Sequence, residues 1–157
     1  MGTSLFEESE GKLLTVMVGE QEYGIPILEA REVVQMMDIE VIPHTPDFMR
    51  GVINLRGHIY PVIDLRLKFG QEAADATKES CIILVNLAGQ TTGMIVDLLI
   101  GVTRLNPKDY EEHPELGNHI EAHFIAGMAK LEDRVILVLD LDDVLSNEEL
   151  RQIQPVE

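Results

Sequence analysis

The chain has 157 residues, of which 45% are hydrophobic, 12 are Lys or Arg and 28 are Asp or Glu, so its formal net charge is −16. This apolar content excludes general disorder, and the length suffices for one compact unit with a sizeable core. A strongly acidic surface repels phosphate backbones and anionic lipid heads, so we expect no nucleic-acid binding and no direct membrane insertion.

The start of the chain and its lone cysteine bear on location. The first residues, MGTSLFEESEGK, lack the basic and apolar regions of a signal peptide, and no apolar run reaches the roughly 18 residues that a membrane-spanning helix needs. Cys81 lies in an apolar run and cannot form an internal disulfide, which favours a reduced core thiol. The expected location is the cytoplasm.

The first elements in chain order are an arm, two strands and a helix. Residues 1–11 are small, polar and acidic, and we expect a flexible arm. Alternating apolar residues predict strands over residues 13–18 and 23–25. From Pro26 onward the apolar spacing changes to three and four, which predicts a short amphipathic helix over residues 27–37.

The most regular pattern is GVINLRGHIYPVIDLR, residues 51–66. Apolar or small residues occupy every second position from Ile53, which predicts a strand, a turn near Gly57 and a second strand. Gly51 and Gly57 suit turn or bulge geometry.

Arg56 is the unusual residue of this segment, because we expect it within a strand otherwise suited to burial. Its guanidinium must reach solvent or meet a carboxylate, for which Glu32 and Asp64 are the candidates. A structural salt bridge and a partner-docking role are both open, and they are compatible.

A polar gap over residues 70–80 is the best candidate boundary between two halves. Beyond it, residues 81–87 and 93–102 predict one hairpin, and residues 128–131 and 135–140 predict another. A short polar tail ends the chain.

The two halves contain related units. One constant offset along the chain carries Leu14 onto Ile83 and Gly24 onto Gly93, within the first hairpin of each half. A second, slightly larger offset aligns Phe48 with Phe124, Gly51 with Gly127, Leu55 with Leu131 and Asp64 with Asp140. Each half therefore has about five short strands, which predicts two small packed barrels or a closed sandwich.

We accordingly predict an all-β fold with short helices and one domain over residues 12–145. Its two barrel subdomains are expected at approximately residues 12–70 and 80–145, and strands can be exchanged between them. Residues 1–11 form the flexible acidic arm and residues 146–157 the polar C-terminal tail.

The sequence offers no recognisable catalytic constellation. It has no nucleophile motif and no glycine-rich phosphate-binding motif, and its serines lie in arms and linkers. Asp64 and Asp140 occupy equivalent positions and could act as an acid–base pair if close together. Each ends a strand before a polar turn, however, where Asp more simply accepts hydrogen bonds from following N–H groups. We expect no enzyme and no cofactor.

Three histidines form the alternative site. His119 and His123 are spaced for one face of a helix, with His113 upstream, so they could bind zinc or a small ligand in a β-barrel module. Pro and Gly interrupt this segment, which favours ordinary loop histidines.

These motifs resemble the CheW family, the adaptors of bacterial chemotaxis arrays. The resemblance covers residues 13 to about 145 and rests on Arg31-Glu32-Val33, Pro43 and Pro46, GVINLRG at 51–57, PVIDLR at 61–66, Val96-Asp97 and Gly127. The family is similar throughout to the regulatory domain of the histidine kinase CheA.

The resemblance implies two packed five-stranded SH3-like barrels and a non-enzymatic scaffold. Its implied partners are the regulatory domain of CheA, against apolar barrel surfaces, and the cytoplasmic tip of methyl-accepting chemoreceptors, in a groove between the barrels. Such a protein is cytoplasmic and is recruited to membrane-associated receptor arrays.

The family's Glu–Arg pair maps onto Glu32 and Arg56. The implied partner-binding residues are Glu32, Val33, Asn54, Arg56 and Gly57, and the structural motif residues are Gly51, Pro61, Asp64 and Gly127. In the second half Lys130-Leu131-Glu132-Asp133 replaces Asn54-Leu55-Arg56-Gly57, so the repeated fold does not require the latter. This difference directs the functional hypothesis to Arg56.

Overall fold

Strands make up most of the protein. The computed structural model describes residues 5–112 and 124–154. The strands in these ranges are β1 (Lys12–Val18), β2 (Gln21–Pro26), β3 (Ala30–Gln35), β4 (Met49–Leu55), β5 (His58–Asp64), β6 (Cys81–Leu87), β7 (Gln90–Val96), β8 (Leu98–Arg104), β9 (Tyr110–Glu112), β10 (Ile125–Leu131) and β11 (Arg134–Leu139). The helical segments are α1 (Leu5–Glu8), η1 (Ile27–Glu29), α2 (Leu65–Lys68), η2 (Pro107–Asp109) and α3 (Asn147–Ile153).

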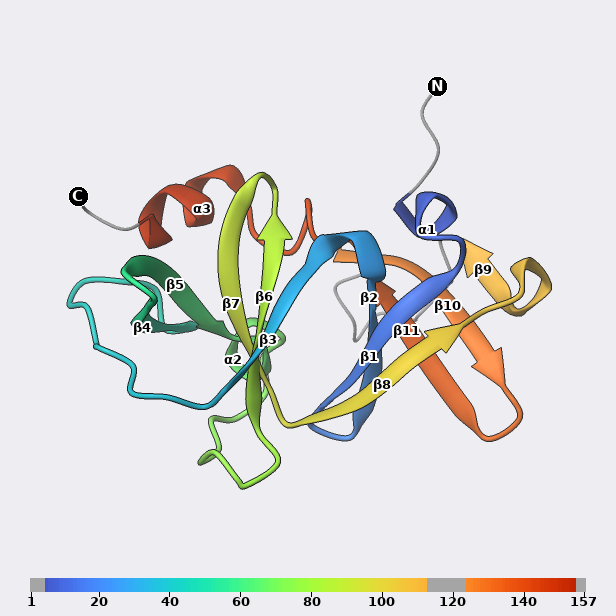
Figure 1. The fold of residues 1–157 in the computed structure, drawn as a ribbon, viewed down its shortest axis with the longest axis horizontal. Helices are drawn as coiled ribbons and strands as arrows, with labels where there is room; N and C mark the ends of the chain where they lie inside the picture. The colour runs from blue at the N-terminus through green and yellow to red at the C-terminus, as the bar shows by residue number, and fades with distance from the viewer. Residues whose placement is uncertain (1–4, 113–123, 155–157) are drawn as a thin grey trace.

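The strands form two sheets that lie side by side (Figure 1). Barrel A consists of the sheet β8-β1-β2-β11-β10-β9, and barrel B consists of the sheet β3-β6-β7-β5-β4. The predicted mainly β fold with short helices is confirmed. Barrel A carries one additional short strand, β9, which comes from the segment where the second half of the sequence is longer.

The predicted internal repeat is visible in the strand register. In β4–β5, Met49 faces Ile63, and in β10–β11 the equivalent residues of the repeat, Ile125 and Leu139, face each other. Both hairpins have a register shift at the same place. Each hairpin also pairs in parallel with a strand of the other half, β5 with β7 and β11 with β2. The two halves of the chain therefore share the pairing of their strands as well as the pattern of their residues.

The two halves of the sequence exchange strands. Barrel A combines β1 and β2 of the first half with β8 to β11 of the second, whereas barrel B combines β3, β4 and β5 with β6 and β7. The divisions at residues 12–70 and 80–145 thus describe halves of the sequence, and each barrel is a composite of both.

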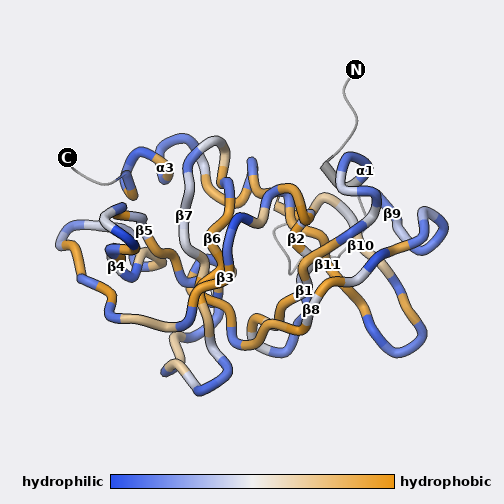
Figure 2. Tube along the Cα trace, in the orientation of Figure 1, coloured by the Kyte–Doolittle hydropathy of each residue, from blue (hydrophilic) through white to orange (hydrophobic). Residues whose placement is uncertain are grey.

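The largest apolar cluster is shared by both barrels. It includes Leu14 and Val16 of β1 in barrel A together with Ile63 of β5 and Ile83 of β6 in barrel B. Two smaller clusters each belong to one barrel, because alternate residues of the same strands point to the opposite side of the sheet. Figure 2 shows the apolar strands in the middle of the molecule and the polar turns at its ends.

An aromatic stack crosses the shared cluster. The ring centre of Phe69, which follows α2, lies 4.5 Å from that of Phe124 and 5.0 Å from that of Tyr23. Tyr23 belongs to β2 and Phe124 precedes β10, both in barrel A, so Phe69 fastens the end of β5–α2 to the other barrel.

The helix predicted over residues 27–37 is wrong. Only Ile27–Glu29 form a helical turn, and Ala30–Gln35 form β3, in which burial alternates residue by residue. β3 pairs with β6, with Val33 opposite Ile83. The β-branched pair Val33-Val34 suits a strand. The apolar residues of this short segment fit helical spacing and strand alternation almost equally, and hydrogen bonding to the edge of β6 selects the strand.

Both ends of the described chain contain helices that the sequence did not predict. In the expected flexible arm, Leu5–Glu8 form α1 and Ser9 is buried. In the expected polar tail, Asn147–Ile153 form α3, which begins with a capping box. Leu150 and Ile153 of α3 pack on the shared cluster, so two apolar residues at helical spacing are enough to dock this helix.

Gly51 gives a test of the hairpin's backbone geometry. Its φ is +144°, and a Cβ atom there would collide with the backbone carbonyl of Glu40, whereas Gly57 has φ +87° and open space around it. Gly51→Ala should therefore lower the free energy of unfolding by about 3 kcal/mol, and the matched Gly57→Ala by about 1 kcal/mol. Urea unfolding measures both, and equal losses would contradict the role of the Glu40 contact.

Candidate functional site

The polar centre of the motif forms a two-residue hairpin turn between β4 and β5. Arg56 and Gly57 both have positive φ, +52° and +87°, as a type I′ turn requires. The Oδ1 of Asn54 accepts a hydrogen bond of 3.1 Å from the Gly57 N–H. Asn54 and Gly57 therefore build the turn, and Arg56 lies at its tip, not within a strand as we predicted.

Arg56 is an unfavourable residue for this backbone position. Gly, Asn and Asp are the usual residues at positive φ, because other side chains meet the following carbonyl there. The β6–β7 turn has the same geometry, with Ala88 at φ +52° and an Asn86 Oδ1 that accepts from the Gly89 N–H, so the backbone alone does not single out Arg56. What distinguishes this turn is the exposed guanidinium that it carries.

The guanidinium of Arg56 binds Glu32 on β3, which is at the opposite end of the strand order from β4. The Nη2–Oε1 distance is 2.6 Å, and the two side chains are 66% and 38% exposed. The hydrogen bond from Arg56 lowers the pKa of Glu32, so Glu32 is ionised at neutral pH. An ion pair this exposed contributes little to stability. Of the two predicted carboxylate partners, Glu32 is thus correct and Asp64 is not.

The other predicted partner-binding residues are also exposed in barrel B. Val33 follows Glu32 on β3 and is 45% exposed, and Asn54 and Gly57 are exposed at the turn. His58 stacks on Tyr60 just beyond the turn, with ring centres 6.1 Å apart. All five predicted residues therefore lie in barrel B, on β3 or at the β4–β5 turn, and the contacts among them join Glu32 to Arg56 and Asn54 to Gly57.

The predicted motif residues Pro61, Asp64 and Gly127 occupy structural positions. Pro61 is buried within β5. Asp64 caps α2, since its Oδ1 accepts from the Arg66 N–H at 2.9 Å, and its Oδ2 binds Arg50 at 3.1 Å. Any side chain at Gly127 would overlap the ring of Tyr110.

Asp64 and Asp140 are equivalent turn residues of different barrels. The Asp140 Oδ1 accepts from the Asp142 N–H at 3.1 Å, just as Asp64 accepts from Arg66. Their charges have opposite surroundings, because Asp64 faces Arg50 whereas Asp140 faces Asp142 and Asp143. Burial, and next the charge of Asp143, raise the pKa of Asp140.

The zinc hypothesis falls on residues that the structure does not describe. His113, His119 and His123 lie within residues 113–123, outside the described ranges. Among residues 5–112 and 124–154, no three His, Cys, Asp or Glu side chains are grouped to hold a metal ion. Cys81 is half-buried, and burial raises the pKa of its thiol, which disfavours a nucleophilic thiolate.

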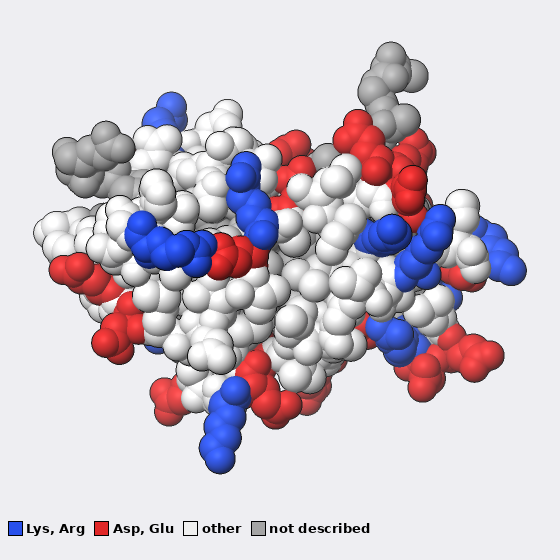
Figure 3. Space-filling view, viewed as in Figure 1, with Lys and Arg blue, Asp and Glu red and all other residues white. Residues whose placement is uncertain are grey.

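The single strand predicted over residues 93–102 is wrong, because the structure divides it at Asp97 into β7 of barrel B and β8 of barrel A, and the exposed apolar face of β8 was not predicted. On β8, the edge strand of barrel A, Ile100 is 44% and Val102 is 62% exposed. The offset that carries Gly24 onto Gly93 also carries Val33 onto Val102, so extending the repeat beyond the first hairpin would have found it. β3 and β8 cross the same side of the molecule (Figure 1), and Figure 3 shows the middle of this side as largely uncharged.

No helix in the described part of the chain is long and apolar enough to cross a membrane.

Known proteins have related sequences. Residues 12–149 match the family model described as the CheW-like domain. The chain is 32% identical over 145 residues to the chemotaxis protein CheW of Klebsiella aerogenes, covering 92% of this chain and 87% of that protein. It is 30% identical over 138 residues to CheW of Rhizobium meliloti, covering 88% and 89%.

The chain is also similar to a solved structure. The crystal structure of the scaffolding protein TtCheW from Thermoanaerobacter tengcongensis matches with a TM-score of 0.81 and 36% identity, covering 89% of this chain and 95% of that one. Two packed SH3-like barrels, as predicted from the resemblance, are the fold of this chain.

The contrast between Asp140 and Asp64 predicts a pH dependence. Because the folded-state pKa of Asp140 is raised, its stabilising contribution is complete below the unfolded-state pKa of about 3.9 and is lost as the pH rises through the folded-state pKa. Asp140→Asn keeps the acceptor oxygen and removes the charge. It should match the parent protein near pH 4 and become increasingly more stable towards pH 7 in urea unfolding.

Asp64→Asn is the matched control at the equivalent turn. It weakens the contact with Arg50 and should lower stability at pH 7. A constant difference in stability between Asp140→Asn and the parent at every pH would refute the raised pKa of Asp140.

The strained turn predicts that Arg56 is dispensable for folding. Arg56→Asn places a favoured residue at positive φ and removes only an exposed ion pair. The melting temperature should stay the same or rise, with Glu32→Gln as a control that removes the carboxylate charge without altering the turn. A clear drop in melting temperature for both variants would show that the pair is structural.

Proposed function

Since this chain belongs to the CheW-like domain family, we propose that it is a non-enzymatic adaptor that couples methyl-accepting chemoreceptors to the histidine kinase CheA. The family is one of chemotaxis adaptors and scaffolds. The observation that carries the proposal is Arg56, held by Glu32 at an exposed, strained turn whose residues the equivalent β10–β11 hairpin does not share. Receptor and kinase contacts both occur in the cytoplasm, so we place the protein there, at membrane-associated receptor arrays.

The receptor-facing surface is proposed to comprise Glu32, Val33 and Arg56 of barrel B together with Ile100 and Val102 of barrel A. Exposed apolar residues grouped on one side of a protein are typical of interaction surfaces. A helical receptor tip can lay its apolar residues against Val33 and Val102, as helices do in grooves of other proteins. The Glu32–Arg56 pair would then set orientation and specificity by its charges.

The kinase contact is proposed to use a different part of barrel B. Ile59 on β5 is 45% exposed, and Val41, in the segment between β3 and β4, is 77% exposed. The regulatory domain of CheA has the same fold by family resemblance, so barrel-to-barrel packing through such apolar side chains is geometrically feasible.

The central test is Arg56→Glu in arrays reconstituted from the receptor fragment, the kinase and this protein. Replacing the guanidinium by a carboxylate opposes Glu32 and reverses the charge offered to the receptor, so receptor-dependent kinase activation should fall roughly tenfold or more. The isolated variant should remain folded. The matched control is Glu132→Arg, which changes the charge at the equivalent turn of barrel A and should leave activation intact.

A second variant tests whether Glu32 and Arg56 contact the receptor directly or only support the local structure. Glu32→Arg combined with Arg56→Glu restores an ion pair with its polarity reversed. Activation that stays low supports a direct receptor contact by these side chains. Normal activation by Arg56→Glu alone would refute the proposed role.

A further inference from the structure

Between its described strands, the chain passes from one barrel to the other at two crossovers. In the first half, β2 of barrel A continues through Ile27–Glu29 into β3 of barrel B. In the second half, β7 of barrel B continues into β8 of barrel A through a single residue, Asp97. The conformation of this one residue therefore determines the direction in which β8 leaves barrel B.

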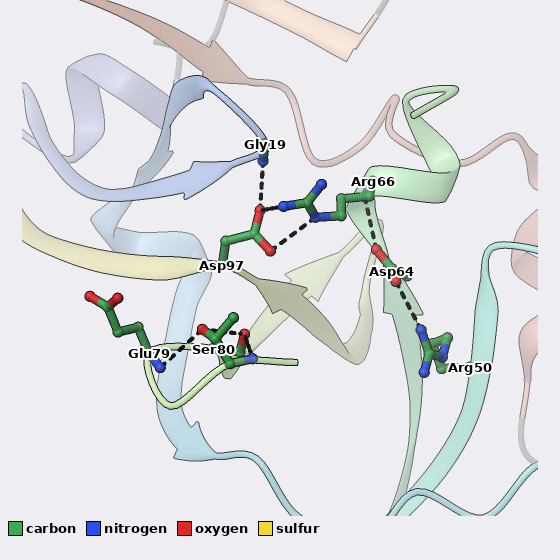
Figure 4. Close-up of polar contacts among 8 residues, drawn as sticks. Gly19, Arg50, Asp64, Arg66, Glu79, Ser80 and Asp97 are labelled. Atoms are coloured by element: carbon green, nitrogen blue, oxygen red, sulfur yellow. Dashed lines mark hydrogen bonds and ion pairs between the residues drawn. The ribbon is translucent and has the colours of Figure 1, made fainter. Parts of the chain in front are cut away.

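Asp97 is bound on every polar atom of its side chain (Figure 4). Its Oδ2 accepts from the Gly19 N–H at 2.6 Å and lies 2.7 Å from the Arg66 Nη2, and its Oδ1 accepts from the Arg66 Nε at 3.0 Å. Its own N–H donates to the carbonyl of Met17 at 2.9 Å. A two-point Arg–carboxylate contact of this kind fixes direction as well as distance.

This network joins the two barrels. Gly19 lies in the β1–β2 turn of barrel A, whereas Arg66 belongs to α2, at the end of β5 in barrel B. Gln71, which follows α2, packs directly against Gly19. The Arg66 N–H in turn binds Asp64, whose other oxygen binds Arg50, so the contacts continue into β4 (Figure 4).

The repeated fold does not require this network. At the other crossover, Leu28 is the repeat equivalent of Asp97, and it is 59% exposed. The repeat equivalent of Arg66 is Asp142. Leu28 and Asp142 cannot form an ion pair, and that crossover still forms. The Asp97–Arg66 pair therefore serves something specific to β8.

We propose that Asp97 and Arg66 are positioning residues that align Ile100 and Val102 of β8 with the Glu32–Arg56 part of the receptor-facing surface. This inference rests on the proposed function. The shared apolar cluster holds the barrels together without directional preference, whereas the ion pair fixes where β8 begins. A partner that spans both barrels depends on this alignment, and a partner that contacts barrel B alone does not.

The test compares two partners on the same variants. Arg66→Gln and Asp97→Asn should each weaken binding of a purified receptor-tip fragment roughly tenfold and leave binding of the purified CheA regulatory domain unchanged, both measured by calorimetry. The double variant should bind the receptor fragment no more weakly than either single variant, because each single change already removes the same Asp97–Arg66 contact. Lys68→Gln is the matched control, since it breaks another α2 ion pair, with Glu149, and should leave both affinities unchanged.

A structural measurement accompanies the affinities. Spin labels at Gln35 on β3 and Arg104 on β8, in a Cys81→Ser background, should show a broader or shifted distance distribution in the two variants and not in Lys68→Gln. Arg66→Lys, which keeps the charge and loses the forked contact, should give an intermediate receptor affinity.

The outcomes separate the inference from the proposed function. If the parent protein does not bind the receptor fragment, the proposed function fails. If the parent binds and the variants bind equally well, or lose both partners together, the positioning role is overturned and the proposed function stands. An unchanged label distance with weakened receptor binding also overturns it.

Discussion

The shared apolar cluster is the constraint on which the rest of this structure depends. Strands of both barrels contribute to it, so neither sheet can bury that face alone. Apolar burial is non-directional and accounts for the association, but it leaves the relative placement of the strands to other contacts. The two crossovers supply that placement, because β3 and β8 each leave the barrel in which the preceding strand lies.

The crossovers also explain where an interaction surface can form. The strands that follow the crossovers, β3 and β8, are edge strands of their sheets, and both present apolar side chains outward, Val33 on β3 and Val102 on β8. Val33 and Val102 are equivalent positions of the repeat, but each has a local contact beside it that the other lacks. One is the Glu32–Arg56 contact on β3, and the other is the Asp97–Arg66 contact before β8. Both contacts use arginine, whose forked guanidinium combines charge with direction.

Repetition gives an internal reference for judging which residues the fold requires. Positions that agree between the halves, such as Gly51 and Gly127, serve bulges or close packing. Positions that differ carry the exposed or bridging charges. The same comparison explains why Asp140, which is partly buried and faces other carboxylates, is stabilised by protonation, whereas Asp64 is held by an ion pair with Arg50.

The sequence by itself determined the β4–β5 and β10–β11 hairpins and their repeat, and it directed attention to Arg56, because residues close in the chain set strand alternation and turn chemistry. It did not determine that residues 30–35 are a strand, since the edge of β6, from the other half of the chain, imposed that structure. The sequence also did not predict the ion pair between Arg66 and Asp97 or the composition of each barrel from both halves of the chain. They depend on which distant strands meet when the shared cluster forms, and only the tertiary structure decides that.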